Sequence, residues 1–153
     1  MSHETMVHRT TTLERTYDAS PARTFHAWAD PDIRRAWGSP SDEVEICNEA
    51  ADFRVGGEDV QTCLVGGEAV ATVVGRYHDI VPDKRIVYTE IISDPAALMG
   101  MSLVSAEFIA QGRGTRLVLT LQTVAVDGSD LLEGVEAGWS SALDRLGAQF
   151  ARV

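Results

Sequence analysis

Three titratable side chains could orient a substrate and move protons if they met inside a folded domain: Tyr77, Tyr88 and Glu90. Phenol hydroxyls and carboxyl groups act as general acids or bases when they lie within hydrogen-bond reach of a reacting atom. All three fall in stretches with strand-like patterns. Catalysis would require at least two of them to converge in one cavity, which the spacing does not establish, so the sequence assigns no catalytic residue.

The histidines and cysteines lack the spacing of a metal site, because neither a His-Glu-x-x-His nor a Cys-x-x-Cys pattern occurs. His78 and Asp79 could form an acid/base pair only if both faced inward, but adjacent strand residues point to opposite faces. No Gly-x-Ser-x-Gly elbow marks a nucleophilic serine. Gly56-Gly57 and Gly66-Gly67 stand between strands and indicate hairpin turns, not phosphate loops. We therefore predict neither a metal nor a cofactor.

Large aromatic side chains fall on faces that the strand and helix patterns turn inward. They either fill a core or line a ligand pocket, in which a hydroxyl or indole N–H would orient a ligand with one polar end. The residues predicted to line such a cavity are Trp37, Tyr77, Tyr88, Val104, Phe108, Leu119 and Trp139.

Charged side chains offer less specific candidates for the same pocket. Arg54 and Arg76 could pair with a ligand carboxylate, although a solvated strand face is the more ordinary place for them. Alternation along the acidic stretch from Asp42 to Asp59 could turn one carboxylate inward, and the pattern leaves open which one.

These side chains would be positioned by one strand, two short helices, a series of strands and a long helix. Ser20-Pro21 and Asp30-Pro31 are strong helix starts that meet at a bend near Ala29-Asp30. Alternation and turn residues predict strands over Val7 to Tyr17, Val44 to Cys47, Asp52 to Val55, Asp59 to Val65, Ala69 to Val81, Arg85 to Ile92, Met101 to Ala110 and Thr115 to Val124.

The last segment has the clearest pattern, with apolar residues at steps of three and four from Leu132 to Val153. It predicts an amphipathic helix of about 22 residues that begins with a capping box formed by Asp130 and Glu133. Gly134 and Gly138 lie on a flank of the apolar face, where they would either allow close backbone approach or leave room beside Trp139.

Strands joined by tight turns form antiparallel pairs, and a long helix with one apolar stripe is the natural cover for such a sheet. We therefore predict an α+β helix-grip fold: a curved antiparallel sheet of six to seven strands wrapped on a long C-terminal helix, with two short helices after the first strand. One helix does not fill the concave side of so wide a sheet. We expect the remainder to be a cavity of more than roughly 300 Å³.

Seven stretches in this order carry a resemblance to a known family. They are Tyr17-Asp18-Ala19-Ser20-Pro21 with Phe25, Trp28 to Trp37, Asp52-Phe53-Arg54-Val55-Gly56-Gly57, Gly75-Arg76-Tyr77-His78-Asp79-Ile80-Val81-Pro82, Arg85-Ile86-Val87-Tyr88-Thr89-Glu90, Gly114-Thr115-Arg116-Leu117 and Gly138-Trp139 to Leu146. The order of strands and helices resembles that of the START/Bet v 1-like (SRPBCC) superfamily. Within it, the motifs are similar to bacterial single-domain proteins related to the C-terminal domain of the Hsp90 ATPase activator.

Composition limits the partners. The 153 residues carry 13 basic and 23 acidic side chains, a formal charge of −10 that disfavours nucleic acid and anionic membrane surfaces. The start of the chain lacks the pattern of a secretory signal, so we expect a cytoplasmic protein with reduced Cys47 and Cys63. We expect one domain over 1–153 with residues 1–6 loosely held, and association into a homodimer is left open.

The sequence favours a protein that binds a small hydrophobic or aromatic molecule in an internal cavity, for transport, sequestration or sensing. The alternative is an enzyme that uses polar groups in the same cavity. The superfamily that the sequence resembles includes polyketide aromatases, cyclases and hydrolase-like proteins. A third interpretation is an Hsp90-type chaperone cofactor. We rank it last because the separate N-terminal domain of the eukaryotic activators has no counterpart in these 153 residues.

Overall fold

A computed structural model of the chain describes residues 5–39, 42–126 and 130–151. Its elements follow the predicted order: β1 (Val7–Tyr17), α1 (Pro21–Ala29), α2 (Pro31–Gly38), β2 (Glu45–Ala51), β3 (Glu58–Val65), β4 (Glu68–Val81), β5 (Arg85–Ser93), β6 (Leu98–Gln111), β7 (Gly114–Ala125) and α3 (Leu131–Phe150). Of the predicted loose terminus 1–6, residues 1–4 lie outside the described part, as does Val153, the predicted last residue of the long helix.

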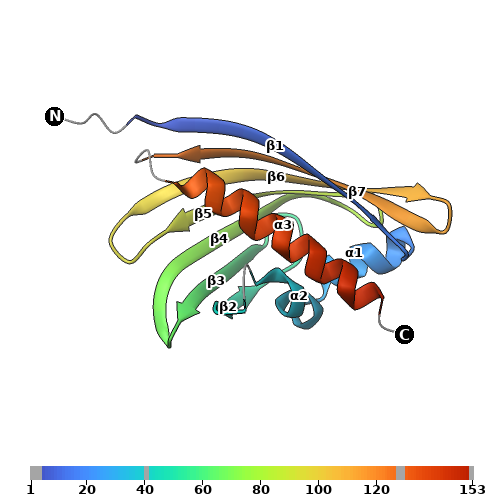
Figure 1. Cartoon of the computed structure of the whole chain (residues 1–153), viewed down its shortest axis with the longest axis horizontal. Coiled ribbons are helices and arrows are strands. Elements are labelled where there is room, and N and C mark those ends of the chain that lie inside the picture. Colours follow the sequence, from blue (N-terminus) through green and yellow to red (C-terminus); the bar gives the residue numbers. More distant parts are fainter. Residues whose placement is uncertain (1–4, 40–41, 127–129, 152–153) are drawn as a thin grey trace.

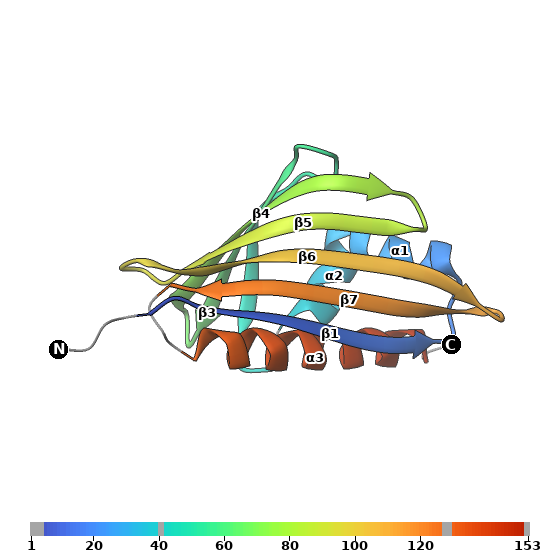
Figure 2. The same ribbon diagram turned by 90° about the horizontal axis from the view of Figure 1, so that it is seen from above.

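The seven strands form one antiparallel sheet in the order β1-β7-β6-β5-β4-β3-β2. This sheet curves around α3, which crosses its concave side, and α1 and α2 lie at one end (Figure 1). The view from above shows α3 running along the sheet beside β1 and β7 (Figure 2). The predicted helix-grip fold is therefore confirmed. Of the helices described, none is both long and apolar enough to cross a membrane.

The two short helices begin where the sequence predicts. The Ser20 side chain accepts a hydrogen bond from the Arg23 amide at 3.1 Å, with Pro21 in the first turn. Asp30 ends α1 and begins α2, and its carboxylate accepts from the amides of Asp32 and Ile33 at 2.9 and 3.2 Å. This shared cap fixes the bend between the two helices.

The capping box predicted for α3 is wrong. Asp130 occupies the N-cap position, but its side chain makes no capping hydrogen bond. Glu133 instead forms an ion pair with Arg9 on β1 at 3.3 Å. An interaction between α3 and the edge strand has therefore taken the place of the local one, and α3 is 20 residues long, not 22.

One of the predicted glycine turns is also wrong. Gly66 and Gly67 form the expected two-residue turn between β3 and β4, both with positive φ. The β2–β3 connection instead takes up residues 52–57, including the expected strand from Asp52 to Val55. There Gly56 donates to the Tyr77 carbonyl at 2.8 Å, and the Tyr77 amide donates to the Gly57 carbonyl at 3.1 Å. The loop therefore pairs with β4 and does not form a tight hairpin.

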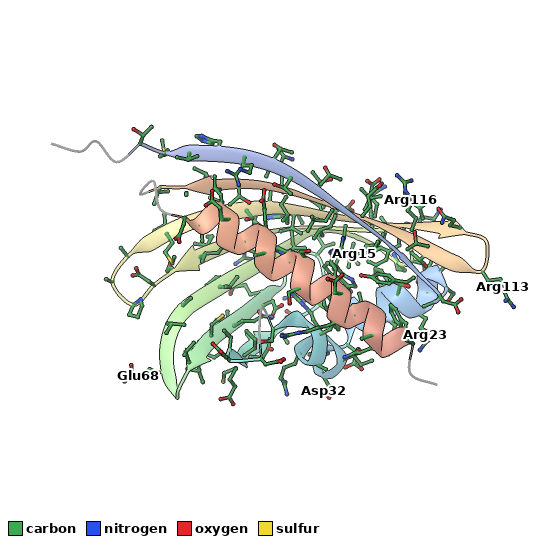
Figure 3. The ribbon with its side chains drawn as sticks, viewed as in Figure 1. Arg15, Arg23, Asp32, Glu68, Arg113 and Arg116 are labelled. Atoms are coloured by element: carbon green, nitrogen blue, oxygen red, sulfur yellow. The ribbon has the colours of Figure 1, made fainter. Side chains whose placement is uncertain are left out.

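The formal charge lies on the outside of this shell. Asp32, Glu68 and Arg113 are exposed and project away from the body of the molecule (Figure 3). Ion pairs on the surface, such as Arg85 with Asp79 at 2.6 Å, offset part of that charge. The buried side chains between α3 and the sheet are mostly apolar and aromatic, which makes the few charged groups found there informative.

Candidate functional site

A partly open pocket of about 160 Å³ lies between α3 and the concave face of the sheet. Its walls come from α2, from strands β2 to β5 and from α3. The lining residues are Arg34, Trp37, Gly38, Ile46, Gln61, Cys63, Val73, Glu90, Ile92, Gly134, Val135, Gly138, Trp139 and Ala142. Gly134 and Gly138 thus leave room on α3 beside Trp139, where the sequence placed it.

The pocket is smaller than the 300 Å³ expected, because aromatic side chains fill much of the concave side. Trp28 is at the centre of this packing. Its ring stacks on Trp139 with centroids 5.6 Å apart, and it lies 5.0 Å from the Trp37 ring and 6.0 Å from Phe108. The remaining space matches one ring-sized molecule, since a cavity of about 150 Å³ can hold benzene.

The seven side chains predicted to line a cavity are distributed over three places. Trp37 and Trp139 lie in the pocket wall. Tyr77 lines a second cavity of about 20 Å³. Arg34 lines both this cavity and the pocket of about 160 Å³. The other four are buried in the core and do not border the pocket: Tyr88, Val104, Phe108 and Leu119.

A charged cluster lies at the inner end of the pocket. Arg34 on α2 forms an ion pair with Asp59 on β3, and their side chains are only 13% and 6% exposed. Arg34 Nη1 also donates to the Tyr77 hydroxyl at 2.5 Å, and that hydroxyl donates to Asp59 at 3.4 Å. The Asn48 side-chain amide donates to Asp59 at 2.9 Å. Asp59 is thus the inward carboxylate that the acidic stretch left unspecified.

The sheet register places a second carboxyl group in the same row. Gly75 on β4 is paired with Asp59 on β3 and with Glu90 on β5. Gly75 places no side chain between the two acidic residues, and an added Cβ there would lie only 3.3 Å from the Asp59 carbonyl oxygen. One step along the sheet, Tyr77 is paired with Tyr88, and their ring centroids are 5.4 Å apart. The register therefore brings together the three titratable residues that the sequence singled out.

Burial changes the proton affinity of these groups. It raises the pKa of Glu90 to about 7, with Arg34 lowering that value and Asp59 raising it. Burial also raises the pKa of Tyr77 to about 12 and holds the pKa of Tyr88 well above its usual range. Although burial disfavours the charge on Arg34, its acidic and phenolic neighbours keep the pKa of Arg34 above the ordinary value. The guanidinium is therefore charged, whereas Glu90 titrates near neutrality.

Two buried polar groups have no hydrogen-bond partner in the described part of the chain: the Tyr88 hydroxyl and the Trp28 indole nitrogen. The Arg34 guanidinium carbon lies 5.8 Å from the centre of the Tyr88 ring. Buried polar groups are rarely left unpaired. The interior around Arg34 therefore holds more polar groups than its own hydrogen bonds satisfy.

Several other sequence candidates lie outside the pocket. Arg54 pairs with Asp52 at 2.8 Å and Arg76 with Glu58 at 3.2 Å, both on the surface. His78 is exposed and lies 3.0 Å from the Thr89 hydroxyl. Both cysteines are free thiols, and Cys63 lies in the pocket wall. Over the described ranges, no group of three or more potential metal ligands comes together.

Sequence reasoning missed Arg34 and left Asp59 unspecified. The signal for Arg34 is its spacing, three residues before the buried Trp37 on the same helix. Asp59 could not be singled out from strand alternation. The inward face of β3 carries Asp59, Gln61 and Cys63, whereas the apolar Val60, which the pattern would turn inward, lies on the other face.

The element order and the sheet wrapped on α3 define a helix-grip protein. Residues 18–151 match the family model described as Activator of Hsp90 ATPase homolog 1-like protein. The chain belongs to this family, whose fold is known for ligand binding. Comparison with curated proteins gave no match.

Solved structures of bacterial proteins agree with this assignment. The Mll3558 protein from Rhizobium loti is 39% identical with a TM-score of 0.84, over 94% of this chain and 98% of that chain. An uncharacterised protein from Rhizobium leguminosarum is 31% identical with a TM-score of 0.82, over 97% and 98%. Protein CV1439 from Chromobacterium violaceum is 27% identical with a TM-score of 0.81, over 92% and 96%.

Proposed function

We propose that this protein binds a small, mainly apolar molecule with one ring in the pocket between α3 and the sheet. The observation that carries the proposal is the pocket of about 160 Å³, lined by apolar Trp37, Val135 and Trp139 and by the charged Arg34 and Glu90. Apolar walls with a few convergent polar groups are the usual composition of a small-molecule site. The apolar walls would provide affinity, and the polar end would fix the ligand's orientation.

A pair of substitutions in α3 tests this proposal. A methyl group added at Gly134 would meet nothing within 4 Å, so Gly134→Ala should leave binding intact. Gly134→Leu should project a larger side chain into the pocket and abolish binding. The measurement is calorimetric titration with single-ring compounds, together with quenching of tryptophan fluorescence. Binding that is absent from the wild type, or equal in the two variants, would contradict the proposal.

Catalysis in the same pocket is the second candidate, and the position of Glu90 favours it. A carboxyl group with a pKa of about 7 exchanges protons readily at neutral pH, which suits a general acid or base. Tyr77 and Tyr88 are neutral at that pH, and burial raises the pKa of both still further above it. Any proton transfer would therefore centre on Glu90.

Deuterium exchange separates the two functions. Compounds that bind are incubated with the protein in D2O, and mass spectrometry follows deuterium incorporation into the compound. Incorporation that depends on Glu90 and is lost in Glu90→Gln would establish proton transfer. Binding without incorporation would leave the protein as a carrier or sensor.

A further inference from the structure

We propose that the ligand carries a cationic amine and that Glu90 is the group that receives it. This inference rests on the proposed binding function and names the chemistry of the ligand's polar end. It follows from a difference between the two carboxylates of the site, from the charge balance around them and from the aromatic pocket walls.

The two carboxylates differ in their partners. Asp59 is bound by Arg34, by the Asn48 amide and by the Tyr77 hydroxyl, so its oxygens are occupied within the protein. Glu90 lines the pocket, and in the described chain no hydrogen bond reaches its carboxyl group. Its interaction with Arg34 is one of charge alone. Glu90 is therefore the carboxylate that is available to a ligand.

The charges of the site favour a cation over an anion. Among the described residues that line the pocket, Arg34 and Glu90 are the charged ones, and Arg34 already pairs with Asp59. When Glu90 is ionised, two carboxylates face one guanidinium, which leaves one negative charge. A single ammonium group would neutralise it, whereas a ligand carboxylate would add a second unpaired negative charge to a partly buried site.

The aromatic walls suit the same ligand. The indole N–H of Trp37 donates to the Ala27 carbonyl at 3.0 Å, so Trp37 offers the pocket only its apolar ring. Trp139, whose ring stacks on Trp28, forms another part of the wall. Tryptophan faces attract cations as well as apolar groups. The ring of an aromatic amine would therefore meet apolar walls in the same pocket whose lining includes the Glu90 carboxylate.

Proton release provides a signature of this arrangement. The charged or titratable groups around Glu90 are Arg34, Asp59, Cys63, Tyr77 and Tyr88. Of these, only Arg34 brings a positive charge, and it lowers the pKa of Glu90. A second cation would lower that pKa further. Amine binding at pH 7 should therefore release protons from Glu90 and should weaken as the pH falls below 7.

The experiment compares three compounds that share one ring: benzylamine, benzyl alcohol and benzoate. Calorimetry at pH 8 should give the tightest binding for benzylamine, with at least an about tenfold preference over benzoate. The preference should shrink at pH 5.5, where Glu90 is protonated. Calorimetry at pH 7, in buffers of different ionisation enthalpy, should show proton release with benzylamine and none with benzyl alcohol. Glu90→Gln should abolish the preference.

The outcomes separate the two proposals. Binding of benzoate or benzyl alcohol as tight as that of benzylamine would overturn the amine assignment and leave the proposed binding function standing. Failure of all three compounds to bind would count against the binding function itself. If Glu90→Gln does not fold, Glu90→Asp keeps the charge, and the wild-type series with its pH dependence still decides the question.

Discussion

The guanidinium of Arg34 on α2 and the carboxylate of Asp59 on β3 form an ion pair that is almost shielded from solvent. Desolvating two charges is costly, and good geometry with further hydrogen bonds is needed to offset that cost. Here Tyr77 and Asn48 supply those hydrogen bonds. The pair holds a short helix against one end of the sheet, and through Arg34 it borders the pocket.

Asp59→Asn should destabilise the protein by roughly 3–5 kcal/mol, because it leaves a buried guanidinium without its main counterion. Urea unfolding measures this change. Because Asp59 raises the pKa of Glu90, the same variant should lower that pKa below its wild-type value of about 7. An NMR titration of the Glu90 carboxyl carbon checks the direction. An unchanged or higher pKa would show that the two carboxylates are not coupled.

Glu90→Gln should change how stability depends on pH. An unfolded chain releases the Glu90 proton near pH 4.5, whereas the folded protein holds it to about pH 7. Between these values the folded state binds more protons, so the free energy of unfolding that Glu90 contributes falls as the pH rises. In Glu90→Gln this decrease in the free energy of unfolding does not occur. The stability of the variant relative to the wild type should therefore increase from pH 4.5 to pH 8.

Urea unfolding of both proteins across this pH range supplies the measurement. The difference between the two isolates Glu90, since every other carboxylate is common to both. A difference that stays constant with pH would place the folded-state pKa of Glu90 near its ordinary value. It would also weaken the case for general acid or base chemistry at this residue.

The order of elements could be predicted from local signals, because Ser-Pro and Asp-Pro caps, paired glycines and apolar periodicity act within a few residues. The charged cluster could not. On β3, Asp59, Gln61 and Cys63 lie on the inward face while the more apolar Val60 and Leu64 alternate with them, so the hydrophobic pattern indicates the opposite phase. Departures from binary patterning are expected at functional sites.

Pairing between distant strands determines the other features of the site that the sequence does not predict. Glu90 meets the cluster only because Gly75 lies between it and Asp59 across three strands, and two β-bulges set that alignment. Arg34 joins the charged cluster because the bend at Asp30 turns α2 toward the sheet. The size of the pocket likewise depends on how Trp28 packs against four other rings, which residue spacing does not specify.

Tyr17→Phe should destabilise the protein by about 1–2 kcal/mol, since the buried Tyr17 hydroxyl donates to the Leu143 carbonyl of α3 at 2.7 Å. Burial also raises the pKa of Tyr17, consistent with a hydroxyl held in the interior. The matched control is Tyr88→Phe, because the Tyr88 hydroxyl has no partner among the described residues. That variant should be neutral or stabilising in thermal unfolding. Equal losses in both variants would show that the hydrogen bond to Leu143 contributes no more than an unpaired hydroxyl does.

Gly134→Ala should stabilise the protein by about 0.5–1 kcal/mol, because alanine removes backbone freedom from the unfolded chain at an open helical position. Gly147→Ala is the control in the same helix. Its added methyl group would lie 3.1 Å from the Tyr17 ring, which the bond to Leu143 holds in place. Thermal unfolding should therefore show a gain for Gly134→Ala and a smaller gain or a loss for Gly147→Ala. A loss of thermal stability in Gly134→Ala would mean that other atoms already fill the space beside Gly134. The volume of the pocket would then be less than about 160 Å³.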